Sequence, residues 1–240
     1  MIGCTCPVCT SPDPKDQRLR TAALIKWDGV HLAIDTGPDF RQQMLRSGIE
    51  YLNGVLLTHE HNDHIIGLDD VRPFNFRQWT DMPVYAHPRV QDELKRRFAY
   101  IFATENRYPG APMVELKHLD KDSVFDWGDL NVRAVEVMHG KLPVLGFRLN
   151  DVAYLTDMRT ISDLQRDKLK GVRRLIVSAL HHQEHHSHMN LQQALDFIAE
   201  IGPEEAFLIH ISHRMGCYRN VQPDLPTGVQ LAFDGLEIPL

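Results

Sequence analysis

Short apolar runs alternate with amphipathic segments along the whole chain, and no repeat or low-complexity stretch interrupts them. Two apolar runs, at residues 21–25 and 31–35, flank Asp28-Gly29. Such a pair around a two-residue Asp-Gly connection is typical of a β-hairpin with a tight turn. The first part of the chain is therefore expected to begin its sheet with this hairpin.

Two segments have helical spacing. Residues 38–47 predict a helix, because a proline comes early, apolar side chains recur at helical intervals and Gly48 follows. Residues 89–102 predict a second helix, with Val90, Leu94, Phe98 and Ile101 on one face. Its basic Lys95-Arg96-Arg97 run is interpreted as a solvated face of that helix.

A third apolar segment, residues 55–58, predicts a buried strand that leads directly into the run T-H-E-H-N-D-H. His59, His61, Asp63 and His64 therefore leave one strand end within six residues. Imidazole and carboxylate groups suit zinc, manganese or iron. One short turn cannot direct all four at a single ion and leave it open to a substrate, so the run favours two neighbouring metals.

Most histidines in proteins are ordinary surface or core residues, and this chain has 14. That interpretation is adopted for His31, His87 and His118. It fits the 59–64 run poorly, because closely packed imidazoles without a metal would each need a separate hydrogen-bond partner.

The second half of the chain repeats the arrangement of a strand followed by a metal-ligand type. Residues 130–138 predict a strand that ends at His139, residues 152–156 one that ends at Asp157, and residues 206–209 one that ends at His210. Singly, Asp157 could cap a helix starting at Thr160, and His139 could be a loop residue. As a set they predict a site, because strand ends converge in layered α/β folds.

Cys4, Cys6 and Cys9 form a separate cluster in C-T-C-P-V-C. The spacing is too tight for disulfides between neighbours but suits three thiolates around one zinc ion. Cys217 and the later histidines are candidates for the fourth ligand, and spacing alone does not choose between them. The alternative is a cluster of reduced or redox-active cysteines in the cytosol.

Composition sets the class of protein. A chain of 240 residues with 43% hydrophobic content can bury the core of one large domain. No apolar run is long enough to cross a bilayer and the first residues lack a signal segment, so a soluble cytoplasmic protein without membrane partners is expected. The net charge of −6 argues against broad affinity for nucleic acid.

The motif H-E-H-N-D-H, followed in order by His139, Asp157 and His210, resembles the ligand signature of the metallo-β-lactamase superfamily. The C-T-C-P-V-C start, I-D-T-G-P-D-F-R, H-G-K-L-P-V-L-G-F, H-I-S-H and the ending F-D-G-L-E-I resemble the PhnP-like phosphodiesterase subgroup. The resemblance implies an α/β fold, a four-layer αβ/βα sandwich, as a single domain over residues 1–240. Relatives usually begin with an apolar strand and a G-T-G loop, so this chain is expected to lack the family's first strand.

The resemblance also implies a set of metal ligands. His59, His61 and His139 would hold one divalent metal, and Asp63, His64 and His210 a second, with Asp157 bridging the two. Cys4, Cys6, Cys9 and His213 would hold one structural zinc, which leaves Cys217 as a small buried thiol. Asp35 would orient the metal-binding loop. Zinc and manganese both accept the mixed ligand set of the catalytic site.

The implied reaction is attack of a metal-bridging hydroxide on a small or cyclic phosphate ester. The run 185–188 resembles the loop that supplies a catalytic histidine, and His186 and His188 are both candidates to protonate the leaving alkoxide. Together with Asp63 they are the predicted catalytic residues. Ser178 stands where several relatives carry an acid, and Lys141 is interpreted as either a phosphate contact or an exposed structural lysine.

Other functions of the same fold stay open at this point. They are tRNA 3′-end processing or another nuclease activity, thioester or lactone hydrolysis, and iron-dependent oxidoreduction. A metal-holding scaffold without turnover is a further alternative, and the complete ligand set argues against it. The resemblance allows a homodimer, but no pattern in the sequence indicates its interface.

Overall fold

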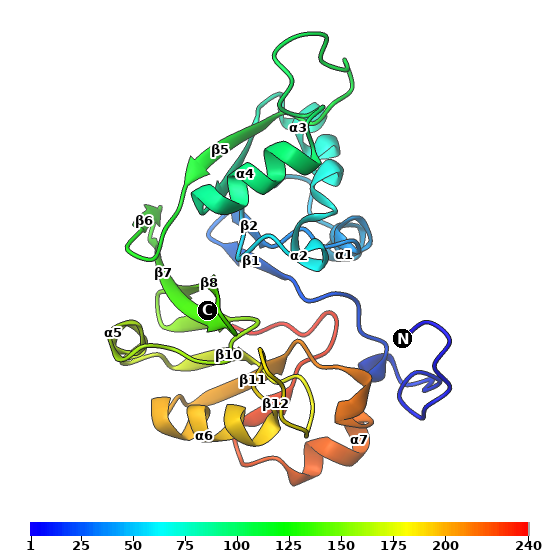
Figure 1. The fold of residues 1–240 in the computed structure, drawn as a ribbon, viewed down its shortest axis with the longest axis vertical. Coiled ribbons are helices and arrows are strands. Elements are labelled where there is room, and N and C mark those ends of the chain that lie inside the picture. Colours follow the sequence, from blue (N-terminus) through cyan, green and yellow to red (C-terminus); the bar gives the residue numbers. More distant parts are fainter. Residues whose placement is uncertain (240) are drawn as a thin grey trace. The chain divides into compact units, whose positions relative to one another are not determined.

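The computed structural model describes residues 1–239 (Figure 1). The chain forms two compact units, each with its own sheet and its own apolar core. The first unit combines residues 1–19 with the chain from residue 124 onward, and the second comprises residues 20–123. Among the described residues, no helix has the length and apolar character that crossing a membrane requires.

The second unit has a five-stranded sheet in the order β1-β2-β3-β4-β5. β1 and β2 are antiparallel, and the remaining neighbours are parallel. The strands are β1 Ala23–Trp27, β2 Val30–Ile34, β3 Gly54–Leu56, β4 Met82–Ala86 and β5 Val114–His118. The helical segments are α1 Phe40–Ser47, α2 Asn62–Ile65, η2 Leu68–Val71, α3 Arg72–Gln78 and α4 Pro88–Arg97.

The predicted hairpin and first helix are confirmed in this unit. Trp27 pairs with Val30 across a two-residue turn in which Asp28 and Gly29 both have positive φ, the conformation that this hairpin connection requires. α1 ends at Ser47 and is capped by Gly48, whose φ of 66° lies in the left-handed region that glycine enters without strain.

The predicted helix over residues 89–102 is shorter than expected, because α4 ends at Arg97. Phe98 leaves the helical conformation with φ −113° and ψ 42°, and Ile101 then donates its backbone N–H to the Phe98 carbonyl in a turn. Phe98 and Ile101 are nevertheless buried in the same core as the apolar face of α4. The apolar pattern therefore identified buried positions correctly but not the end of the helix.

The first unit has a seven-stranded sheet in the order β12-β11-β10-β9-β8-β7-β6. Neighbours from β6 to β9 are antiparallel, and neighbours from β9 to β12 are parallel. The strands are β6 Val124–Trp127, β7 Leu130–His139, β8 Leu142–Leu149, β9 Val152–Leu155, β10 Arg174–Ser178, β11 Glu205–Ile209 and β12 Val229–Leu231. The helical segments are η1 Pro14–Asp16, α5 Asp163–Arg166, η3 Asp167–Leu169, α6 Leu191–Ile201, η4 His213–Met215, α7 Tyr218–Val221 and η5 Gln222–Asp224.

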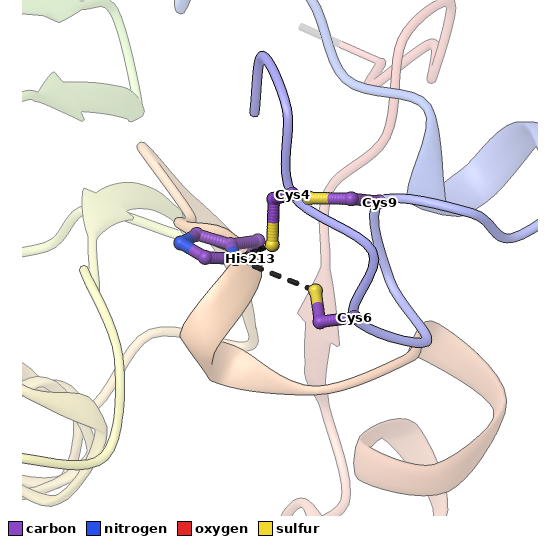
Figure 2. Close-up of side chains that lie close together, drawn as sticks. All are labelled: Cys4, Cys6, Cys9 and His213. Carbon is purple, nitrogen blue, oxygen red and sulfur yellow. Dashed lines mark hydrogen bonds between the residues drawn. The ribbon is translucent and has the colours of Figure 1, made fainter.

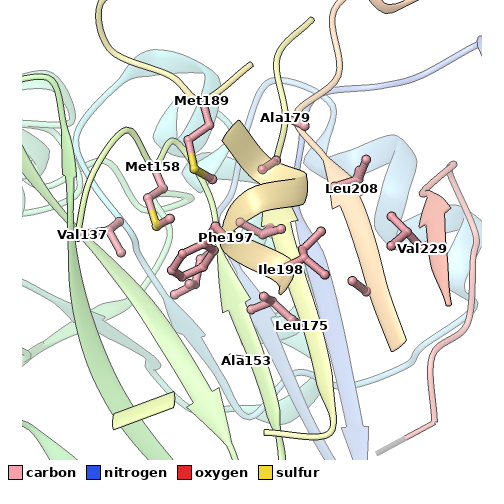
Figure 3. Packing of buried hydrophobic residues seen from close by; sticks show 14 of the residues in the cluster. Val137, Ala153, Met158, Leu175, Ala179, Met189, Phe197, Ile198, Leu208 and Val229 are labelled. Atoms are coloured by element: carbon pink, nitrogen blue, oxygen red, sulfur yellow. The ribbon is translucent and has the colours of Figure 1, made fainter. Parts of the chain in front are cut away.

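Helix α6 covers one face of this sheet. Asn190 begins the helix with a capping box in which its side chain accepts from the Gln193 backbone and the Gln193 side chain accepts from Asn190 N–H. Phe197 and Ile198 point from α6 into a core that includes Leu175 (Figure 3). Burying one apolar side chain of this size contributes about 1.5–3 kcal/mol to the free energy of folding. These contacts therefore hold α6 against the parallel strands.

Candidate metal centre

The H-E-H-N-D-H run lies at the end of β3 in the second unit. β3 is a short buried strand, and the chain continues through buried Thr58 and His59 into the single turn of α2. His64 lies within α2 and is also buried, whereas His61 is exposed. The local fold therefore gathers the predicted ligands of the run on one strand–helix connection.

Asp35 fixes the orientation of two of these histidines. Its carboxylate is fully buried and accepts hydrogen bonds from the Thr58 backbone N–H at 2.9 Å and from the Thr58 hydroxyl at 2.9 and 3.0 Å. It also accepts from His64 Nδ1 at 2.7 Å. Because His64 donates through Nδ1, Nε2 is the nitrogen that its neutral ring can offer to a metal.

Thr58 transmits the same effect to His59. The single hydroxyl proton of Thr58 is directed to Asp35, so Thr58 Oγ1 accepts from His59 Nδ1 at 3.0 Å. Nε2 is then the nitrogen that a neutral His59 ring can offer to a metal, and it lies 3.0 Å from His61 Nδ1. The rings of His59 and His64 lie 4.3 Å apart, and Asp63 Oδ2 lies 3.7 Å from His64 Nε2.

Two strand ends in the first unit hold their ligand-type residues by unusual backbone geometry. Asp157 follows β9 and His210 follows β11, and both have positive φ, 52° and 53° respectively. Asp35, after β2, has a φ of 67°. Non-glycine residues in this region are uncommon and concentrate at functional sites, where the surrounding structure stabilises them.

His139 is oriented by a backbone group. It is the last residue of β7, and its Nδ1 lies 2.9 Å from the carbonyl oxygen of Ser187. Since a carbonyl only accepts, His139 donates through Nδ1, and Nε2 is the nitrogen that its neutral ring can offer to a metal. The alternative roles considered for the strand ends are wrong: His139 belongs to a strand, and the cap of the next helix, α5, is Ser162 rather than Asp157.

The structure places the two histidines considered for proton transfer very differently. His186 is exposed, whereas His188 is buried beside Asp157, with 3.7 Å between His188 Nδ1 and Asp157 Oδ1. Asp157 Oδ1 lies 3.3 Å from His210 Nε2, and the His188 ring stacks on the His210 ring at 5.0 Å. Burial lowers the pKa of His188 to about 3, against the opposing effect of Asp157, so its ring is neutral at pH 7.

These donors fit divalent metals. His139, Asp157 and His188 each offer a ligand atom within 4.8 Å of the others in the first unit, and His188 Nδ1 is buried without a hydrogen-bond partner. In the second unit, His59 and His64 each direct Nδ1 at an acceptor of the protein, which makes Nε2 the nitrogen that can bind a metal. Imidazole nitrogen and carboxylate oxygen are the ligands that zinc and manganese take in proteins.

A separate group of ligands lies near the start of the first unit. Figure 2 shows Cys4, Cys6 and Cys9 around the His213 ring, and the four ligand atoms lie within 4.8 Å of one another. His213 Nδ1 is 3.5 Å from Cys4 Sγ and 3.4 Å from Cys6 Sγ, and the contact with His213 lowers the pKa of the Cys6 thiol to about 6. The group fits a tetrahedral zinc, whose ligands lie roughly 3.5–3.8 Å apart. Cys217 is buried outside it, as predicted.

Ser178, which stands where several relatives carry an acid, accepts from the Met158 N–H directly after Asp157. Two other contributors were not singled out by the sequence: Thr58 links Asp35 to His59, and the Ser187 carbonyl orients His139. A threonine before the histidine run was the only visible signal among these. The ordinary histidines behave as expected: His31 contacts the Tyr51 carbonyl and His87 caps α4.

Comparisons with known proteins identify related chains. The sequence profile described as "Beta-lactamase superfamily domain" matches residues 31–211. A crystal structure described as a new diphosphatase from the PhnP family is 36% identical with a TM-score of 0.91, over 98% of this chain and 89% of that chain.

Two curated relatives have other activities in their names. A Porphyromonas gingivalis protein named octanoyltransferase is 42% identical over 238 residues, which are 98% of this chain and 48% of that protein. A ribonuclease Z of Bradyrhizobium diazoefficiens is 30% identical over 139 residues, which are 56% of this chain and 45% of that protein. The chain thus spans about half the length of the curated relatives that it matches.

Proposed function

The chain belongs to the PhnP family of the β-lactamase superfamily, and we propose that it is a dinuclear metal-dependent phosphodiesterase acting on small or cyclic phosphate esters. The predicted fold class is confirmed, an α/β metallo-β-lactamase fold with two sheets. Its family is one of metal-dependent hydrolases, and the phosphodiester substrate is the further step proposed here.

One observation carries the proposal. His59, His64 and His139 each direct Nδ1 at a hydrogen-bond acceptor of the protein, respectively Thr58, Asp35 and Ser187. In each neutral ring, Nε2 is then the nitrogen that can bind a metal. Neutral histidines held in one tautomer by an outer acceptor are characteristic of metal ligands, and a purely structural role would not require the same tautomer three times.

Following the family resemblance, we assign His59, His61 and His139 to one metal and Asp63, His64 and His210 to the other, with Asp157 shared. The Cys4, Cys6, Cys9 and His213 group is assigned one structural zinc. When bound, divalent ions at the catalytic site would supply positive charge for a phosphate ester and make water nucleophilic near neutral pH.

The protein's own residues would then orient the ligands and handle the leaving group. Asp35 and Thr58 keep the histidine lone pairs directed at the ions, and the positive φ at Asp157 and His210 fixes the direction of those side chains. We assign His188, rather than exposed His186, to the leaving alkoxide, because it is buried beside Asp157. Because the His188 ring is neutral, its N–H would donate a hydrogen bond to the leaving oxygen as negative charge develops there, and solvent water would supply the proton.

Two relatives bear on the substrate. The 36% identical PhnP-family structure is of a diphosphatase, which supports chemistry at phosphorus. Similarity to ribonuclease Z makes nuclease activity the nearest alternative. The net charge of −6 favours the small ester, because nucleic-acid binding relies on basic surface to neutralise phosphates.

A second candidate comes from the octanoyltransferase relative, whose name describes chemistry at an acyl group. Water activated at the same ligands could attack a carbonyl carbon, so a thioesterase or lactonase is the competing activity. The matched region is only about half of that relative, and its name covers the whole protein.

The test is a panel assay on full-length protein loaded with zinc or with manganese. The substrates are bis(p-nitrophenyl) phosphate, a 2′,3′-cyclic nucleotide, a diphosphate diester, a precursor tRNA and octanoyl thioesters. Turnover of small phosphodiesters that a chelator abolishes and metal restores supports the proposal. Turnover of the thioester alone, or of the precursor tRNA alone, would contradict it and select the corresponding alternative.

A further inference from the structure

Helix α4 contacts the H-E-H-N-D-H loop from its first and last turns. Positions 59, 61, 63 and 64 of the loop carry the proposed ligands, and Glu60 and Asn62 lie between them. Both intervening residues are bound by arginines of α4. Residues of the loop therefore alternate between proposed metal ligands and residues that contact α4.

Arg97 makes the more extensive of these contacts. Its Nη1 donates to the Glu60 carbonyl oxygen at 2.6 Å and to Asn62 Oδ1 at 2.7 Å. Its Nε donates to Glu93 Oε2 at 3.0 Å, one turn back on α4. A single guanidinium therefore joins the last turn of the helix to the backbone of the loop, a geometry that a lysine ammonium does not reproduce.

Arg89, in the first turn of α4, forms a second attachment. Its Nε lies 3.0 Å from Glu60 Oε1, and the Glu60 side chain is only 14% exposed. The two arginines are eight residues apart, about 12 Å along a helix, and both reach Glu60. The interpretation of 95–97 as a solvated face is thus wrong for Arg97, whose side chain is 23% exposed, and holds for Arg96 at 68%.

We propose that Arg97 is a positioning residue for the metal centre: by holding the Glu60 carbonyl and Asn62, it sets the position of the histidines on either side. This inference rests on the proposed function, because it concerns the same metals. Loop ligands that can shift bind metal less tightly, since outer partners of metal ligands typically change metal affinity by about 10–100-fold. Arg97 itself contacts neither metal nor substrate.

Arg96 provides a matched control. It lies next to Arg97 on the same helix and donates to the same Glu93 carboxylate, at 2.6 Å through Nη2, but no contact joins it to the loop. Arg96→Ala and Arg97→Ala therefore both remove a Glu93 ion pair, and only the second releases Glu60 and Asn62. Asn62→Ala removes one of the two loop contacts and leaves the carbonyl contact in place.

The measurement is the rate of zinc release from full-length, zinc-loaded protein to a coloured chelator, beside thermal unfolding of the stripped protein. The Cys4–His213 zinc, in the other unit, is an internal reference. We expect Arg97→Ala to release the catalytic zinc at least about tenfold faster than wild type, with Asn62→Ala between the two. Arg96→Ala, and the release of the cysteine-bound zinc in every variant, should match wild type.

Arg97→Lys keeps the positive charge but lacks the forked N–H groups of the guanidinium. We expect it to release the catalytic zinc more slowly than Arg97→Ala but faster than wild type. Equal release from Arg97→Ala and Arg96→Ala would overturn the inference, as would equal acceleration at the cysteine site together with a lowered melting temperature. Wild-type protein with zinc at the cysteine site alone would overturn the proposed function first and the inference with it.

Discussion

Two regions carry the candidate ligands, and they present them in different ways. In the second unit four ligands come from six consecutive residues, and other side chains, Asp35 and Thr58, orient them. In the first unit the ligands come from separate strand ends, and backbone features, the Ser187 carbonyl and two residues of positive φ, orient them. Substitution of single orienting side chains should therefore shift the ligands of the run, whereas the backbone holds the strand-end ligands in place.

The largest effect is expected from Asp157→Ala, which removes a strand-end ligand. The proposed centre would lose the carboxylate shared by its two metals, and with it several kcal/mol of transition-state stabilisation. We expect phosphodiester turnover to fall by at least about 10³-fold, while the cysteine-bound zinc stays in place. Elemental analysis beside the assay checks both points. Activity within tenfold of wild type would show that the first unit does not supply the centre.

His188→Ala tests the leaving-group role within the first unit. We expect a loss of about 10²–10³-fold with an alkyl phosphodiester, whose developing alkoxide needs a hydrogen-bond donor. The loss with a p-nitrophenyl ester should be much smaller, because that leaving group departs as an anion. His186→Ala is the matched control in the same loop and should behave as wild type. Equal losses with both esters would refute the assignment of His188.

Asp35→Asn tests the side-chain orientation used in the second unit. An amide keeps the size of the carboxylate but offers one acceptor oxygen, so either His64 Nδ1 or the Thr58 donors lose their partner. We expect catalytic metal affinity to fall by about 10–100-fold. The metal-free protein should also lose about 1–3 kcal/mol of unfolding free energy, because a buried donor is left unpaired. Urea unfolding and metal titration measure the two effects, and wild-type values in both would contradict the role of Asp35.

Thr58→Val gives the smallest effect and separates the two histidines that depend on Asp35. Valine keeps the shape but removes the hydroxyl that joins His59 to the carboxylate, while the His64 contact remains. A neutral hydrogen bond contributes about 1 kcal/mol, so we expect metal affinity to fall less than about tenfold. An effect as large as that of Asp35→Asn would mean that Asp35 acts mainly through His59.

The sequence predicted the parts of this comparison that follow from local pattern. The Asp-Gly hairpin, α1 with its terminal glycine and the strands before His139, Asp157 and His210 all depend on neighbouring residues, and they are confirmed. The end of α4 was missed, because apolar spacing continues past Arg97 into turns that pack in the same core.

Long-range orientation could not be derived from the sequence. Asp35 and His64, or Arg97 and Glu60, are brought together by the sheet and helix packing of the second unit, and no local period encodes such pairs. The role of Asp35 was expected only from the family resemblance, and that of Arg97 was not expected. The choice between His186 and His188 depends on an irregular loop, whose side-chain directions follow neither helical nor strand alternation. The polar residues Glu60 and Asn62, at alternate positions of the metal run, were the one readable hint of its second set of contacts.

The most direct test is elemental analysis of full-length protein beside a Cys4→Ser/Cys6→Ser variant, after free metal is removed. The proposed sites predict about three divalent ions per chain in wild type and about two in the variant, with phosphodiester turnover retained in the variant. One ion in wild type and none in the variant would show that the cysteine group is the metal site of this chain and would contradict the proposed centre.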